Sequence, residues 1–218
     1  YRAYRQNHMY PNSQVETAII CVGDSIMRGG RYNDEFPEMM NHLMDNFTEP
    51  VNLYMIAQGG AKLRQVKSML LKARFHVPEK NKIYVILAGT NDLLKREEPP
   101  EVIAQLHVDE TIGVIQSLKE IRGKKVWVGM LPRKDSEKEG NSWKVNYGIR
   151  FLNGIVKDIN DRIDAYCFSI RVPFVDCRNF YNGKYVRNDY FTNEVHLNSL
   201  GSAKLAQNIY KVCKWRLN

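Results

Sequence analysis

Long hydrophobic runs are missing from this sequence of 218 residues. No apolar run approaches the roughly 18 residues that suggest a membrane-spanning helix. The N-terminal stretch "YRAYRQNHMYPNS" also lacks the apolar core that a secretion signal contains. We therefore expect no membrane span and an intracellular location, in the cytoplasm, the nucleus or a ribonucleoprotein granule.

Cysteine is scarce, and its spacing suits neither disulfides nor metals. The four cysteines contain no CxxC pair and no His/Cys cluster with metal-ligand spacing. Cys21 lies inside an apolar run, which indicates a small core residue. These patterns favour a reducing compartment, and they predict neither a metal site nor a cofactor.

Acidic residues are fewer than basic ones: the sequence has 24 Asp and Glu and 32 Lys and Arg, which gives a net charge of +8. No long Lys/Arg block occurs, so one interpretation is solubility alone. The other is a polyanionic partner such as RNA, attracted through its phosphates whatever its sequence.

Short apolar runs alternate with longer segments of helical periodicity. Because the runs are rich in β-branched and aromatic residues and do not alternate with polar residues, they are typical of strands buried on both faces of a parallel sheet. The expected strands are 17–22, 51–56, 82–88, 125–130 and 172–177. The expected helices are 101–121, 145–163 and 199–215, the last capped by Asn198 or Ser199.

Five strands alternating with helices predict a three-layer α/β/α sandwich with a five-stranded parallel sheet. One domain is expected over residues 15–218. Residues 1–14, with interleaved basic and aromatic side chains, are expected to form an arm outside the fold. Residues 133–142 have the composition of a polar loop.

Four residue types with complementary chemistry follow strand ends. Ser25 comes after the first strand, Gly60 after the second and Asn91 after the third, and His196 follows the last. Since ligands bind at the carboxyl ends of parallel strands, these residues are expected to converge. A hydroxyl, an imidazole base and uncharged N–H donors are what acyl transfer requires.

The stretches "GDS", the glycine block at Gly60, "GTND" and "VHLNSLG" together resemble the SGNH (GDSL-type) hydrolase superfamily. The resemblance extends over nearly the whole chain. It implies a flavodoxin-like sandwich and metal-free hydrolysis of a small acyl ester. Ser25 would be the nucleophile and His196 the proton shuttle. The Ser25 N–H, the Gly60 N–H and the Asn91 side chain would form the oxyanion hole.

Within the superfamily, "VGDSIMR", "GGAKLRQV" and "LPR" look most like esterase domains of LINE-type retrotransposon proteins. More distantly, the chain resembles the OSK domain, a non-catalytic SGNH-like fold that binds RNA. Both likenesses imply an RNA-associated setting.

The sequence departs from the superfamily at the catalytic acid, because Asn193 stands where Asp precedes His by three positions. An asparagine can orient the ring but supplies no charge, and it can favour the wrong tautomer. One hypothesis is a weak esterase with a Ser25–His196 dyad oriented by Asn193. In a second, Glu194 or Asp189 replaces the acid, and in a third the cleft is catalytically dead and the domain binds RNA.

For RNA binding, we expect basic residues near the strand ends to form one positive face, the alternative being scattered solvated charges. These residues are Arg28, Arg31, Lys62, Arg64, Lys67, Lys95, Arg96, Arg133, Lys134 and Arg187. No RNA-recognition, KH or zinc-finger signature is present, so sequence-specific readout is not expected.

Overall fold

The computed structural model describes residues 3–6, 15–30, 37–134 and 149–217. Five parallel strands form the centre of one sheet, as predicted, in the order β3-β2-β4-β5-β6. Their bounds are β2 Thr17–Gly23, β3 Val51–Ala57, β4 Asn81–Leu87, β5 Lys124–Val128 and β6 Phe174–Val175. This is the flavodoxin-like strand order.

A sixth strand, β1 (Ala3–Gln6), pairs antiparallel with β3 at the sheet edge. These four residues were expected to lie outside the fold, and here the structure differs from the expectation. An edge strand presents unpaired N–H and C=O groups, which any extended segment can satisfy without a hydrophobic pattern of its own. The rest of the expected arm, residues 1–2 and 7–14, lies outside the described residues.

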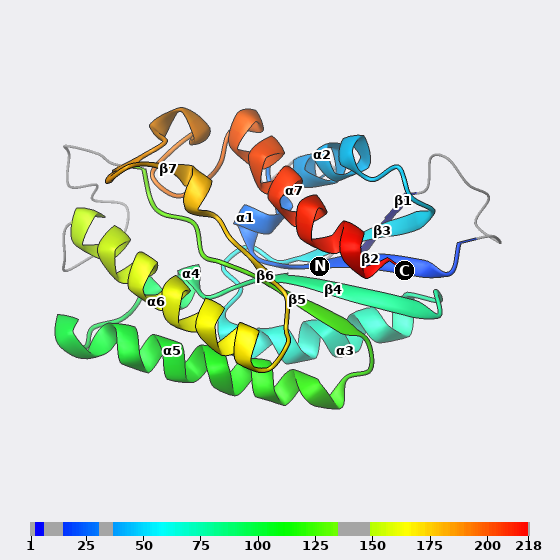
Figure 1. The fold of residues 1–218 in the computed structure, drawn as a ribbon, viewed down its shortest axis with the longest axis horizontal. Coiled ribbons are helices and arrows are strands. Elements are labelled where there is room, and N and C mark those ends of the chain that lie inside the picture. The colour runs from blue at the N-terminus through cyan, green and yellow to red at the C-terminus, as the bar shows by residue number, and fades with distance from the viewer. Residues whose placement is uncertain (1–2, 7–14, 31–36, 135–148, 218) are drawn as a thin grey trace.

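Helices cover both faces of the sheet (Figure 1). On one side lie α2 (Glu38–Asn46) and α7 (Ser199–Cys213), and on the other lie α3 (Val66–His76), α5 (Pro100–Ser117) and α6 (Ile149–Ser169). Two short helices, α1 (Ser25–Arg28) and α4 (Thr90–Leu93), follow strand ends. A small hairpin joins β7 (Tyr181–Asn182) to β8 (Tyr185–Val186).

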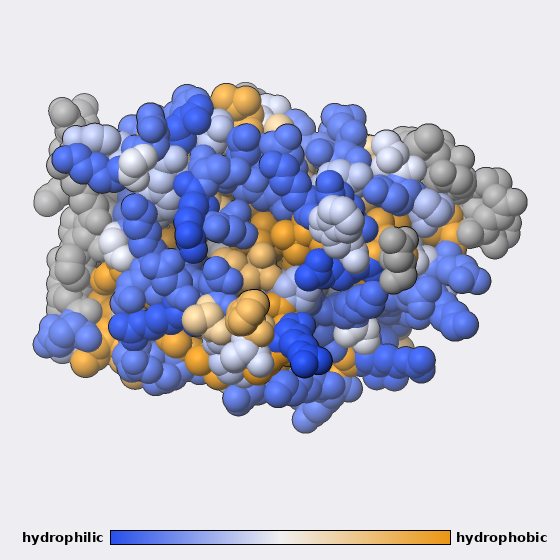
Figure 2. All heavy atoms as spheres, in the orientation of Figure 1, coloured by the Kyte–Doolittle hydropathy of each residue, from blue (hydrophilic) through white to orange (hydrophobic). Residues whose placement is uncertain are grey.

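The central strand β2 explains why the apolar runs do not alternate. Ile20 and Val22 pack into the core beneath α3, α5 and α6, whereas Ile19 and Cys21 pack into the core beneath α2 and α7. Because successive side chains point to opposite faces, a strand between two helical layers must be apolar throughout. Figure 2 shows mostly hydrophilic residues on the face drawn in Figure 1, with apolar residues visible mainly between the helical layers.

Helix boundaries follow local chemistry. The Asn198 side chain caps α7 by accepting the N–H of Gly201 at 2.9 Å, as expected for one of the two candidate caps. The helix expected over 145–163 is α6, which is described over Ile149–Ser169. Val145 and most of the expected polar loop, residues 135–142, lie outside the described residues. Within the described ranges, no helix is long and apolar enough to cross a membrane.

The carboxyl ends of β2, β3 and β4 lie level with one another in the strand register. Gly23 at the end of β2 pairs with Ala57 of β3 on one side and with Leu87 of β4 on the other. The chain passes from β2 to β3 on one side and then crosses to β4 on the other side of β2. A ligand crevice is therefore expected between β2 and β4. Ser25, Gly60 and Asn91 follow these three ends.

Candidate active site

Ser25 is the first residue of α1, two positions beyond the end of β2. The preceding residue, Asp24, caps this helix: its Oδ1 accepts the N–H of Ile26 at 3.0 Å. Asp24 is 1 % exposed, and burial raises the pKa of its carboxyl to about 6. No acceptor among the described residues takes the N–H of Ser25, so this donor is free at the start of the helix.

His196 meets Ser25 across 171 positions of sequence. Its Nε2 lies 3.1 Å from Ser25 Oγ, a hydrogen-bond distance. A tight loop presents the ring: Thr192 N–H donates to His196 C=O at 2.9 Å, and Phe191 bridges to Leu197. The predicted convergence of hydroxyl and imidazole is therefore present in the structure.

Asn193 lies against the other ring nitrogen, and its Oδ1 is 3.2 Å from His196 Nδ1. The same oxygen accepts the backbone N–H of Val195 at 3.0 Å and that of His196 at 2.8 Å. The N–H groups of Val195 and His196 are donors, so the Asn193 side-chain atom that they contact must be its oxygen. The backbone therefore holds the amide with its oxygen, not its NH₂ group, toward the ring.

This amide orientation fixes the histidine tautomer. Because Asn193 Oδ1 can only accept, His196 Nδ1 must carry the proton. The neutral ring then has its lone pair on Nε2, facing the Ser25 hydroxyl. An asparagine that turned its NH₂ group to the ring would impose the opposite, unproductive tautomer.

Burial lowers the pKa of His196 below its ordinary value of 6.5. Burial disfavours the charged form, and the neutral amide of Asn193 does not offset this as a carboxylate would. The ring is therefore neutral at physiological pH and able to accept a proton.

The loop that carries Gly60 is tied to Asn91 in α4 and to β2. Asn91 Nδ2 donates to the carbonyl of Ala61 at 3.1 Å, and Gln58 N–H donates to the carbonyl of Gly23 at 3.0 Å. Gly60 has a φ of 75°, a left-handed conformation that favours glycine. No acceptor among the described residues takes its N–H, which leaves it available to a ligand.

Asp92 belongs to this site but was missed by sequence reasoning. Its Oδ2 accepts the N–H of Leu63 at 2.9 Å and so ties α4 to the segment after β3. Burial raises its pKa. The signal was present in the sequence, since Asp92 directly follows Asn91 in the "GTND" stretch.

Neither alternative acid reaches His196 in the described part of the chain. Asp189 forms a two-pronged ion pair with Arg187, at 3.0 Å from Nε and 2.8 Å from Nη2. Glu194 offers its backbone carbonyl to Lys134 N–H at 2.9 Å, and its carboxylate exerts its charge on Arg133. The hypothesis that either carboxylate replaces the acid is wrong for this geometry.

The basic residues expected to form one positive face differ in burial and in pairing. Carboxylates neutralise three of them: Glu120 lies 2.6 Å from Lys67, Glu110 lies 2.7 Å from Arg96, and Asp189 pairs with Arg187. Arg133 is 5 % exposed, so the expectation that it lies on that face is wrong. The remaining described members, Arg28, Lys62, Arg64, Lys95 and Lys134, are partly or fully exposed. Arg31 lies outside the described residues, and RNA binding stays a prediction.

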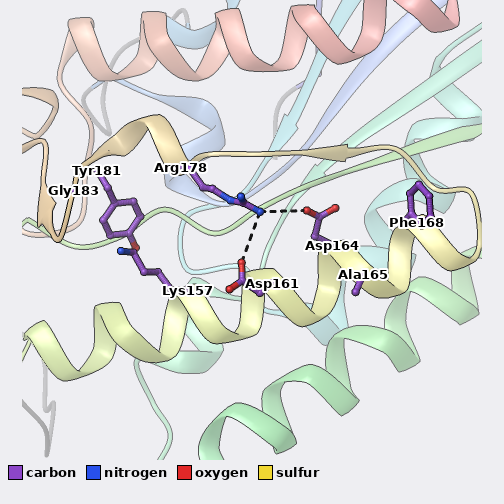
Figure 3. Close-up of a pocket in the computed structure, with 8 residues that line it drawn as sticks. All are labelled: Lys157, Asp161, Asp164, Ala165, Phe168, Arg178, Tyr181 and Gly183. Carbon is purple, nitrogen blue, oxygen red and sulfur yellow. Dashed lines mark ion pairs between the residues drawn. The ribbon is translucent and has the colours of Figure 1, made fainter.

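A cavity of about 840 Å³ lies elsewhere, between α6 and the segment after β6 (Figure 3). Arg178 reaches across it toward Asp161 and Asp164, at 3.9 and 3.8 Å, and the exposed Phe168 lies at one end. Its described lining contains no serine, cysteine or histidine. The cavity therefore lacks the pairing of a hydroxyl or thiol with an imidazole that Ser25 and His196 form.

Metal-binding side chains are not clustered in the described ranges: no group of three or more His, Cys, Asp and Glu is placed to hold an ion. All four cysteines are free and buried. Burial raises the pKa of Cys177 and Cys213 to about 12, so these thiols are inert.

Comparison with known proteins gives one matching family. Residues 21–204 match the profile described as the GDSL-like lipase/acylhydrolase family. No curated protein matches the sequence.

Solved structures share the fold at low sequence identity. A lipolytic G-D-S-L family protein from Veillonella parvula is 19 % identical, with a TM-score of 0.69, over 91 % of this chain and 98 % of that one. A lipase/acylhydrolase from Enterococcus faecalis is 18 % identical, with a TM-score of 0.62, over 92 % and 97 %. An acetylxylan esterase from Geobacillus stearothermophilus is 13 % identical, with a TM-score of 0.63, over 89 % and 92 %.

Proposed function

The chain belongs to the GDSL-like lipase/acylhydrolase family, and on this premise we propose that it is a serine esterase that hydrolyses a small acyl ester. Ser25 is the nucleophile and His196 the general base. Asn193 takes the position of the usual catalytic acid and holds the ring by hydrogen bonding alone.

The proposed reaction has two steps. Ser25 Oγ attacks the ester carbonyl carbon while His196 Nε2 takes the hydroxyl proton, and the same proton then passes to the departing alcohol. The acyl group, now bonded to Ser25, is released as a carboxylic acid when His196 activates a water molecule. In each step the carbonyl oxygen gains negative charge near the Ser25 N–H, the Gly60 N–H and Asn91 Nδ2.

One observation supports this function above the others: the continuous path from Asn193 Oδ1 through His196 to Ser25 Oγ, with contacts of 3.2 and 3.1 Å. The backbone N–H groups of Val195 and His196 orient the amide so that this path runs in the productive direction. Asn193 cannot stabilise the imidazolium by charge, so we expect turnover slower than with an aspartate.

The test is covalent labelling with a fluorophosphonate, which reacts only with an activated serine, beside hydrolysis of p-nitrophenyl acetate. We expect the wild-type protein to gain one phosphonate, mapped by mass spectrometry to Ser25, and to release p-nitrophenol. Ser25→Ala is expected to do neither. Ser199→Ala is the matched control, since Ser199 begins a helix near the site and should not alter labelling. A folded wild-type protein that neither reacts nor turns over would contradict the proposal.

A further inference from the structure

Arg133 is a buried arginine whose neighbour in sequence contacts the loop of the proposed base. It lies on the loop that leaves β5 at the same sheet edge as Ser25 and Asn91. The next residue, Lys134, donates its N–H to the carbonyl of Glu194 at 2.9 Å, only two residues before His196. The loop after β5 is thus joined to the loop that carries the proposed base.

The backbone of Arg133 is held in place from both sides. Its N–H donates to Asn153 Oδ1 at 2.8 Å, and its C=O accepts from Asn153 Nδ2 at 2.9 Å. Asn153 lies on α6 and is itself buried. A rigid helix therefore fixes the point from which the guanidinium extends, as a specificity residue requires.

Two of the three guanidinium nitrogens lack partners among the described residues. Arg133 is 5 % exposed, and its Nε and Nη2 atoms are buried without a hydrogen bond. In the same part of the chain, Glu194 is the one carboxylate whose charge acts on Arg133, and no carboxylate comes within ion-pair distance. Buried charges are normally paired, because an unpaired one loses its hydration without compensation.

We propose that Arg133 is a specificity-determining residue that binds an anionic group, a carboxylate or phosphate, carried by the ester substrate. The planar fork of N–H groups matches two oxygens of such an anion, and Nε and Nη2 are donors on one side of that fork. This inference rests on the proposed esterase function and names its substrate class: esters with a negative charge near the scissile bond.

The test compares three esters. p-Nitrophenyl acetate is neutral, mono-p-nitrophenyl succinate carries a carboxylate on the acyl side, and 4-acetoxybenzoate carries one on the alcohol side. Arg133→Met is expected to lower kcat/KM for one anionic ester by about tenfold to a hundredfold more than for the neutral ester. The anionic ester whose kcat/KM falls shows whether Arg133 contacts the acyl side or the alcohol side of the substrate. Equal effects on all three esters would overturn the inference.

Three further variants sharpen the comparison. Arg133→Lys keeps the charge but loses the fork, so its preference should lie between those of the wild type and Arg133→Met. Glu194→Gln removes the competing negative charge and should strengthen the preference for the anionic ester. Arg162→Met changes an exposed arginine on α6 that pairs with Asp158, and it should leave selectivity unchanged.

A binding assay separates this inference from the esterase proposal. In the Ser25→Ala background, inorganic phosphate is expected to raise the melting temperature, and Arg133→Met should abolish that rise. This result would stand even if no ester were hydrolysed. Phosphate that stabilises both proteins equally would overturn the inference. So would a Glu194→Gln variant that loses stability with no gain in anion preference, since Arg133 would then serve only to pair with Glu194.

Discussion

Replacing His196 with alanine is expected to lower kcat for ester hydrolysis by about a hundredfold to ten-thousandfold, the usual contribution of a positioned general base. Without the imidazole 3.1 Å from its oxygen, Ser25 keeps its proton and stays a weak nucleophile. The measurement is steady-state hydrolysis of p-nitrophenyl acetate, with circular dichroism to confirm that the variant folds.

The double variant gives the sharper result. If Ser25 and His196 act as a unit, Ser25→Ala combined with His196→Ala will be no slower than Ser25→Ala alone. His76→Ala is the matched control, because His76 is exposed at the end of α3 and distant in sequence from every proposed catalytic residue. Multiplicative losses in the double variant would contradict a shared proton-transfer step.

Replacing Asn193 with aspartate is expected to raise kcat/KM by about tenfold to a hundredfold near pH 8. A carboxylate can accept the same N–H groups of Val195 and His196 and the same ring proton, so the geometry is kept. What it adds is a negative charge that stabilises the imidazolium formed in the reaction. In serine proteases the reverse change, aspartate to asparagine, has a larger effect because it also imposes the wrong tautomer, which the backbone prevents here.

The same substitution should move the pH profile in a definite direction. Burial lowers the pKa of wild-type His196 below 6.5, so the neutral, active form persists as the pH falls through 6.5. The aspartate will raise that pKa, and activity will then be lost at a higher pH on the acid side. The advantage of Asn193→Asp should shrink as the pH falls. A larger advantage at low pH would be inconsistent with a charge effect on His196.

The strands and the convergence of the site were predictable because both depend on short-range signals. A strand buried on two faces must be apolar along its length, and a parallel sheet brings the ends of such strands to one edge. Ser25, Gly60, Asn91 and His196 could therefore be grouped without knowledge of any distance.

Two features of the site depend on tertiary contacts and could not be predicted. The presence of Asn193 in the sequence does not determine whether its side-chain oxygen or its NH₂ group faces the His196 ring. Two backbone N–H groups decide this, and they converge only after the loop has closed. Arg133 likewise resembles any surface arginine in sequence, and its burial depends on how the loop after β5 packs against α6.

The most direct measurement of the central claim is the protonation state of each His196 ring nitrogen, read near neutral pH from ¹⁵N multiple-bond NMR correlations and assigned by comparison with His196→Ala. The account predicts a neutral ring with its proton on Nδ1 and a free lone pair on Nε2, directed at Ser25. A proton on Nε2 would mean that Asn193 presents its NH₂ group to the ring. His196 would then have no lone pair on Nε2 to accept the Ser25 proton, which would contradict the proposed mechanism.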